Sequence, residues 1–304
     1  MLTQNLTLLL WVSLMASSFV VSKDILPYAN PITSTGLRFM LASILMLPIV
    51  WKSNVWKKNT FSIDTKIVVQ YGFISLFLVL FFLGLFEALK TTSALRTSVI
   101  YTLVPLISVA LSYAGLKLKT SKSNLLGFML GTAGATWVLL SVNSESPLLL
   151  QWNTGDSIFL AACFSLAMHV MLVKKWGDSI PPTLGAFYIM VIGSVILLPF
   201  LFLFGDLTAV AWQNIQFWKT LLFLTLFTTM ATFFLQQHLV QQVGPNRLLA
   251  FTYLIPGLVA LANGLTITSF LWGAMPGILL TFLALYLISK SPLPKNHIIQ
   301  SNTP

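Results

Sequence analysis

Residues 92–105 read TSALRTSVIYTLVP, and residues 243–256 read VGPNRLLAFTYLIP. Each stretch holds an arginine that is followed nine residues later by a proline, and the two stretches lie 151 positions apart. The same displacement aligns two further pairs of identical residues, Lys23 with Lys174 and Pro48 with Pro199. Four matches at one displacement predict an internal repeat, in which the chain consists of two related halves.

The displacement is about half of the 304 residues. We therefore expect two five-helix repeats, residues 1–145 and 152–289, followed by a polar tail, residues 290–304. Five is an odd number, so the second repeat enters the membrane from the opposite face. The expected architecture is an inverted repeat, which allows one protein to open to either side by exchanging the conformations of its halves.

The composition places the chain in a membrane. Of its residues 57% are hydrophobic and 8% are charged, and the mean hydropathy is +0.88, whereas soluble domains are about 25% charged. Ten crossings of about 20 residues use about 200 residues, which leaves no room for a sizeable aqueous domain. This excludes a soluble enzyme and a conventional nucleic-acid-binding protein. The single cysteine, Cys163, allows no intrachain disulfide.

Ten apolar runs lie between clusters of charged, Pro, Gly, Asn and Ser residues, and each predicts a transmembrane helix. The fold class is thus an all-α integral membrane protein with ten transmembrane helices. Their expected ranges are 5–22, 31–51, 67–88, 95–114, 124–142, 157–174, 183–204, 218–240, 247–269 and 272–289.

The basic residues predict the orientation. With ten crossings, twelve Lys and Arg residues share the side of the two termini, four lie on the other side, and Arg38 lies within the second helix. Basic residues favour the cytoplasmic side, so both termini are expected in the cytoplasm. The net charge of +10 is then mostly a cytoplasmic collar, and no nucleic-acid partner is expected.

The chain resembles the drug/metabolite transporter superfamily, in particular the EamA-type ten-helix transporters of the bacterial inner membrane. The resemblance covers essentially the whole chain, and it implies secondary transport of small organic metabolites through a cavity lined by helices 1, 3, 4, 6, 8 and 9. The matching residues are Trp11, Ser17, Phe19, Lys23, Pro31, Arg38, the segment ALKTTSA at 88–94, Pro105, Gly127, Gly155, Asp156, Gln242, Val243, Gly244, Pro256 and Gly277.

One departure from the family pattern concerns acidic residues. Members often carry a glutamate shortly after the fourth and ninth helices. This chain has LKLK at 116–119 and TITS at 266–269 instead, so ion coupling by those glutamates is not carried over.

Ionisable residues within apolar runs are candidate sites, because burying them in hydrocarbon is costly. Glu87 interrupts a long apolar run, and a displacement of 151 relates it to His238. Together they could bind the two ends of a zwitterion or exchange a proton; alternatively, Glu87 pairs with Lys90 at the interface. His169 lies about halfway along the sixth helix, where either a proton relay or a bond to a neighbouring helix suits it.

Three arginines have two interpretations each. Arg38 lies about seven residues into its helix, where it is a substrate-binding candidate or reaches the lipid headgroups. Arg96 and Arg247 begin the fourth and ninth helices. They either attract anionic substrates to the cavity mouths or anchor their helices at lipid phosphates.

Pro105 and Pro256 fall near the midpoints of the fourth and ninth helices. Each removes a backbone hydrogen bond and crowds the preceding turn, and paired broken helices indicate the transport site. Four aromatic residues are expected to line the cavity beside these kinks: Trp11, Phe86, Tyr101 and Tyr253.

Two GxxxG motifs, Gly127 with Gly131 and Gly273 with Gly277, predict close packing of the fifth and tenth helices or a dimer face. The oligomeric state is a monomer or a homodimer. We find no nucleotide-binding GxxxxGK loop, no metal-ligand pattern, and no sign of a cofactor.

The sequence therefore predicts a transporter, not an enzyme, that exports small metabolites such as amino acids across the bacterial inner membrane by alternating access without ATP. Protons are a candidate coupling ion. A flippase for lipid-linked headgroups with the same fold is the alternative. The sequence chooses neither the substrate nor the direction of transport.

Overall fold

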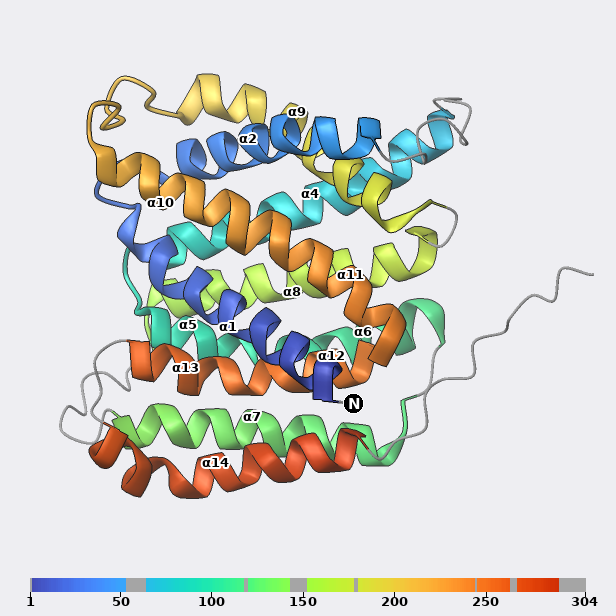
Figure 1. Cartoon of the computed structure of the whole chain (residues 1–304), viewed down its shortest axis with the longest axis vertical. Coiled ribbons are helices and arrows are strands. Elements are labelled where there is room, and N and C mark those ends of the chain that lie inside the picture. The colour runs from blue at the N-terminus through green and yellow to red at the C-terminus, as the bar shows by residue number, and fades with distance from the viewer. Residues whose placement is uncertain are drawn as a thin grey trace, which may run out of the picture.

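The computed structural model describes residues 2–52, 64–117, 120–142, 152–177, 180–243, 245–262 and 267–289. All regular secondary structure in these residues is helical, and the long helices cross the molecule side by side (Figure 1). The expected all-α class is confirmed. The polar tail, residues 290–304, and the junction between the expected repeats, residues 145–151, lie outside the described residues.

The helices follow the apolar runs of the sequence. They are α1 Leu2–Asp24, α2 Pro31–Lys52, α4 Thr65–Ala88, α5 Ala94–Tyr101, α6 Val104–Leu116, α7 Lys122–Val142, α8 Thr154–Trp176, α9 Pro182–Phe204, α10 Ile215–Thr225, the π-helix η3 Leu226–Ala231, α11 Thr232–Val243, α12 Pro245–Phe251, the 3-10 helix η4 Thr252–Leu254, α13 Ile255–Ala262 and α14 Ile267–Ser289.

Eight helices of the described residues are long and apolar enough to cross a membrane, and two shorter apolar helices span Arg247–Ala262 and Gly273–Ser289. The expected boundary between the last two crossings is wrong. α13 ends at Ala262 and α14 begins at Ile267, whereas we expected the ninth crossing to run to residue 269. Residues 267–269, which we assigned to the ninth crossing, belong to the first turn of α14.

The outer surface of the bundle is apolar. Phe202 and Leu203 of α9 are each 74% exposed, and Leu279 of α14 is 62% exposed. Large exposed apolar side chains are a liability in water but face lipid at no cost. This surface suits a chain whose helices lie in a bilayer.

The two predicted proline breaks are confirmed. Pro105 and Pro256 are the second residues of α6 and α13, and the helix before each one ends in a non-α turn. Proline is tolerated in a first helical turn because no backbone donor is needed there. At the first break the carbonyl of the buried Thr102 accepts a hydrogen bond from Thr132 Oγ1 at 3.2 Å.

Three glycines of the predicted motifs, Gly127, Gly273 and Gly277, pack α7 against α14 (Figure 1), whereas Gly131 faces Tyr253. The closest contact involves Gly134, which lies outside the predicted motifs. A Cβ added to Gly277 would lie 2.5 Å from the carbonyl oxygen of Gly134, and one added to Gly134 would lie 2.6 Å from the carbonyl oxygen of Gly277. A Cβ added to Gly127 would lie 2.6 Å from the side chain of Ile288. The backbones approach so closely because these positions lack side chains.

Helices from the two halves of the chain interleave. α4 packs along α8, where a Cβ on Gly84 would lie 2.7 Å from that of Ala162. α2 packs along α9, where the hydroxyls of Ser43 and Ser194 lie 3.1 Å apart. These two serines are separated by 151 residues, the same displacement that aligns the two halves of the sequence.

Candidate functional site

A small cavity of about 70 Å³ lies between the halves of the chain. Its walls come from α1, α4, the α5 and α6 pair, α8, the η3 and α11 pair, and α12. These segments correspond to the six helices that the family resemblance implied. The room suffices for a few water molecules, so a metabolite would need the helices to move apart.

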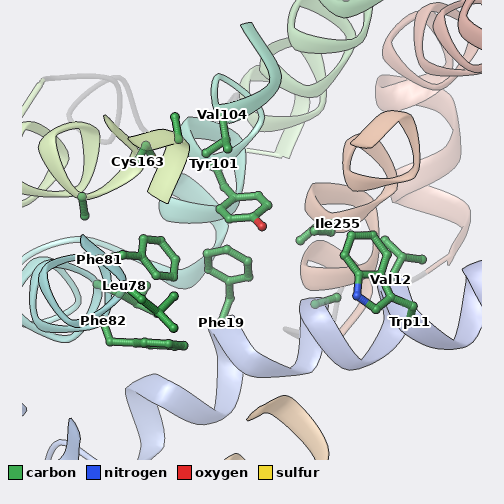
Figure 2. Packing of buried hydrophobic residues seen from close by; sticks show 14 of the residues in the cluster. Trp11, Val12, Phe19, Leu78, Phe81, Phe82, Tyr101, Val104, Cys163 and Ile255 are labelled. Atoms are coloured by element: carbon green, nitrogen blue, oxygen red, sulfur yellow. The ribbon is translucent and has the colours of Figure 1, made fainter. Parts of the chain in front are cut away.

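Aromatic side chains dominate the cavity walls. Phe19 of α1 contacts Tyr101 of α5 edge-on, with ring centroids 5.3 Å apart, and Phe81 and Phe82 of α4 lie beside them (Figure 2). Edge-to-face contacts of this kind hold rings in defined orientations. Trp11 completes the aromatic wall from α1.

Two predicted site residues give the cavity polar groups. His169 of α8 is buried, and its Nδ1 lies 2.9 Å from the carbonyl oxygen of Ile74 in α4. The proton therefore resides on Nδ1, and Nε2 is left as an acceptor. Trp11 Nε1 is buried and has no hydrogen-bond partner among the residues that the structure describes, so it is an available donor in the cavity wall.

Arg38 lies behind the cavity wall and is fully buried. It donates from Nε to Thr229 Oγ1, and from Nη2 to the carbonyl oxygen and Oγ1 of Thr228 at 3.1 and 2.9 Å. Its guanidinium carbon lies 4.4 Å from the ring centroid of Phe82. The interpretation that Arg38 reaches the headgroups is therefore wrong, because the side chain turns inward to α4 and η3.

At one end of the bundle a buried ion pair joins α5 to α8. Arg96 Nη2 pairs with Asp156 Oδ2, and Arg96 Nε donates to Asp156 Oδ1 at 3.2 Å. Thr92 Oγ1 donates to the same Oδ1 at 2.8 Å. We call Thr92, Arg96 and Asp156 the Asp156 lock.

The Asp156 lock corrects two expectations. Arg96 meets a carboxylate of the other half of the chain, with 11% of its side chain exposed, so neither lipid anchoring nor an open cavity mouth describes it. Asp156 was expected in a connection, but α8 begins at Thr154 and the carboxylate is fully buried. The helix starts earlier because Asn153 and Asp156 form a capping box.

At the other end of the bundle, Arg247 of α12 donates from Nη2 to Asn5 Oδ1 of α1 at 2.9 Å. We call this contact the Asn5 bridge. Arg96 in α5 lies near one end of the bundle and Arg247 in α12 lies near the other, as the positions of these two helices show (Figure 1). Adding 151 to Asn5 and Arg96 gives Asp156 and Arg247, so the two contacts join corresponding positions of the two halves.

Four predicted site residues lie away from the cavity. Phe86 packs with Phe217 and other residues at the Asp156 lock end of α10. Glu87 is 48% exposed and pairs with Lys90 at 2.7 Å. His238 is exposed and lies 2.7 Å from Gln242 Nε2.

Tyr253, the fourth, is buried against α7. Its hydroxyl donates to the carbonyl oxygen of Phe128 at 3.0 Å, and its ring fills the space above Gly131. The kinks therefore place only the first of the paired tyrosines, Tyr101, at the cavity. Among the described residues no three His, Cys, Asp or Glu side chains lie close enough together to hold a metal ion.

The roles of Asn5, Thr228 and Thr229 were not predicted from the sequence, and Asp156 was expected to precede the sixth helix. The displacement of 151 carried a signal for Asn5 and Asp156, since it relates these two residues in the same way as it relates Arg96 to Arg247. The threonines gave no comparable signal, because a hydroxyl in an apolar helix usually bonds its own backbone.

Comparison with known proteins agrees with this architecture. The model of the EamA-like transporter family matches residues 2–140 and 153–290. An uncharacterized transporter of Bacillus subtilis strain 168, YyaM, is 25% identical over 242 residues, which are 79% of this chain and 78% of the relative. A second one, YetK, is 22% identical over 252 residues, 83% of this chain and 76% of the relative.

A protein solved by crystallography has the same fold, with a TM-score of 0.67, 16% sequence identity and coverage of 94% of both chains. The family model covers most of the sequence in two segments, and the relatives are named as transporters. The chain belongs to the EamA-like transporter family and is a multi-pass membrane transport protein.

Proposed function

We propose that this protein is a secondary transporter that exports small organic metabolites by alternating access without ATP. Its ten crossings would form two inverted five-helix repeats, residues 1–145 and 152–289. The two segments matched by the family model and the Ser43 to Ser194 contact support this division. In a two-fold arrangement, corresponding residues meet at the axis.

One observation carries the proposal: the Asp156 lock and the Asn5 bridge close opposite ends of the bundle with corresponding residues. The cavity with Trp11, Tyr101 and His169 lies between them. Opening one contact while the other holds would expose the cavity to one side only, which is what alternating access requires. In this conformation both contacts are made.

The proposal predicts that the two ends are coupled, and Cys163 can report it. This is the chain's single cysteine; it is fully buried, and its sulfur lies 3.9 Å from the Ile100 carbonyl oxygen of α5. Because α5 and α8 are the helices that the Asp156 lock joins, opening that end exposes the thiol. The rate of maleimide labelling therefore measures how often the end opens.

The test uses Asp156→Asn, which weakens the lock, together with three residues at position 5. In that background Asn5→Asp turns the Asn5 bridge into an ion pair and favours the conformations in which its end is closed; labelling of Cys163 should quicken. Asn5→Ala removes the bridge, and labelling should slow. A Cys163→Ala variant gives the level of nonspecific labelling. Equal labelling rates with Asn, Asp and Ala at position 5 would show that the ends are uncoupled and would remove the basis for alternating access.

The orientation belongs to the same proposal. The excess of basic residues on the side of the termini supports a cytoplasmic Asn5 bridge and a distant Asp156 lock. A cysteine introduced at Asn5 in a Cys163→Ala background should be labelled from the cytoplasm. Labelling from outside would reverse the direction that we assign to transport.

A further inference from the structure

Arg38 carries a positive charge that no acidic side chain of the described residues balances. The ion pairs in this part of the chain are Glu87 with Lys90 and Asp156 with Arg96. Arg38 is nevertheless fully buried. Burying a charge without a counter-ion is expensive, and intramembrane charges therefore mark functional positions by default.

The hydrogen bonds of Arg38 leave part of the guanidinium unused. Nε and Nη2 spend their three N–H groups on Thr228 and Thr229. Nη1 is buried, and no described residue accepts a hydrogen bond from it. Because guanidinium nitrogens donate only, the two N–H groups of Nη1 can be satisfied only by an acceptor, and most strongly by an anion.

The residues that hold Arg38 also face the cavity. Phe82, on which the guanidinium stacks, and Thr228, which accepts two of its hydrogen bonds, both line the wall. The charge is thus separated from the cavity by a single layer of side chains. Among the described residues that line the wall, none is acidic and none is a lysine or an arginine.

The segment that binds Arg38 is a π-helix, η3. Its wider turns disturb the regular backbone pattern, and such segments occur frequently at functional sites. Thr228 Oγ1 and Thr229 Oγ1 both donate to the carbonyl oxygen of Leu224, at 2.9 and 3.0 Å, which directs their lone pairs toward Arg38. The threonines orient the guanidinium without neutralising it.

We propose that Arg38 is the anion-binding residue of the transport cavity, and that the substrates are organic carboxylates with an apolar body. The carboxylate would meet Arg38 Nη1, and the aromatic wall of Phe19, Phe81 and Tyr101 would contact the body. This proposal rests on the proposed function, since it gives the substrate class of the same cavity. An organic cation finds no counter-ion in the described wall and is repelled by Arg38.

The experiment measures equilibrium binding to the purified full chain in detergent, with three probes that share a phenyl ring and a three-carbon chain. These are 3-phenylpropanoate, 3-phenylpropanamide and 3-phenylpropylamine. The shift of the unfolding temperature with probe concentration reports affinity. The carboxylate should bind about tenfold or more tightly than the amide, as a charge-assisted hydrogen bond implies, and the amine should bind most weakly.

Two arginine variants assign the preference. Arg38→Gln should abolish the difference between carboxylate and amide. Lys219→Gln, which removes an exposed positive charge of α10 outside the cavity wall, should leave the difference as it is. If Arg38→Gln does not fold, Arg38→Lys keeps the charge but loses the guanidinium fork, and the carboxylate should bind it several-fold more weakly than it binds the natural protein.

Three results would overturn the assignment: equal binding of the three probes to the natural protein, a preference for the amine, or no binding of the carboxylate at all. Survival of the carboxylate preference in Arg38→Gln would overturn it too. The measurement needs no transport, so it separates the two proposals. If the carboxylate binds through Arg38 while the rate of Cys163 labelling does not depend on residue 5, the binding site is supported and alternating access is contradicted.

Discussion

Replacing Thr92 by valine removes one hydrogen bond from the Asp156 lock and little else. Thr92 Oγ1 donates to the fully buried carboxylate of Asp156 at 2.8 Å, and valine has nearly the same shape. A hydrogen bond to a charged group contributes about 1.5–3 kcal/mol. That contribution exists only while the lock is closed, so its loss should raise the population of the open conformation about 10- to 150-fold.

Labelling of Cys163 measures this change. The cysteine follows Asp156 by seven residues, which places it about 10 Å deeper along α8, and its thiol is fully buried against α5. If labelling requires the lock to open, the rate should rise by the same factor as the open population. Thr136→Val is the matched control, because Thr136 is exposed and its hydroxyl bonds its own helix, at Thr132.

A Thr92→Val variant with a lower unfolding temperature but the labelling rate of the natural protein would refute the link between the Asp156 lock and opening. The lock would then be a fixed structural contact between α5 and α8. A rise in labelling with Thr136→Val of similar size would point to general loosening of the bundle, and would contradict the assignment as well.

Three further predictions concern packing and the interface. Gly134→Ala and Gly277→Ala should each destabilise the protein by about 1–2 kcal/mol, since overpacking costs about 1–3 kcal/mol and alanine returns up to about 1 kcal/mol of helix propensity. In thermal unfolding the double variant should be no less stable than either single variant, because one separation of the two helices relieves both contacts. Additive losses of stability would contradict this. Tyr253→Phe should lose about 1 kcal/mol with its hydrogen bond to the Phe128 carbonyl, and an unchanged unfolding temperature would refute it. Glu87→Gln should change stability by less than about 1 kcal/mol and leave Cys163 labelling alone; a changed labelling rate would return Glu87 to the functional residues.

Most helices could be predicted from the sequence, because hydropathy and helix-breaking residues act locally. Apolar runs fixed the extent of α9 nearly to the residue, and Pro105 and Pro256 located both helix breaks. The division of the eighth crossing into α10, η3 and α11 was not predicted. The π-helix η3 in particular depends on its contact with Arg38 from another helix, which no local pattern contains.

The site was only partly predictable, for the same reason. Trp11, Tyr101 and His169 line the cavity, and their depth in the membrane and their distance from a kink follow from counting residues. Phe86 and Tyr253 have equally suitable depths but turn to other neighbours. The direction in which a side chain points depends on helix rotation, and an apolar helix with no strong amphipathic pattern leaves that rotation undetermined.

The difference between the two end contacts bears on the direction of transport. The Asp156 lock joins a carboxylate that is fully buried to an arginine and a threonine, whereas the Asn5 bridge is a single hydrogen bond to an exposed amide. Opening the first separates opposite charges held in a poorly hydrated setting; opening the second exchanges one exposed hydrogen bond for water, at a cost of about 1 kcal/mol. The Asn5 end should therefore open more readily at rest. If that end faces the cytoplasm, as the basic residues predict, the protein without substrate opens mainly to the inside. The free energy of substrate binding in the cavity is then available to close the helices around the substrate and to weaken the lock on the far side.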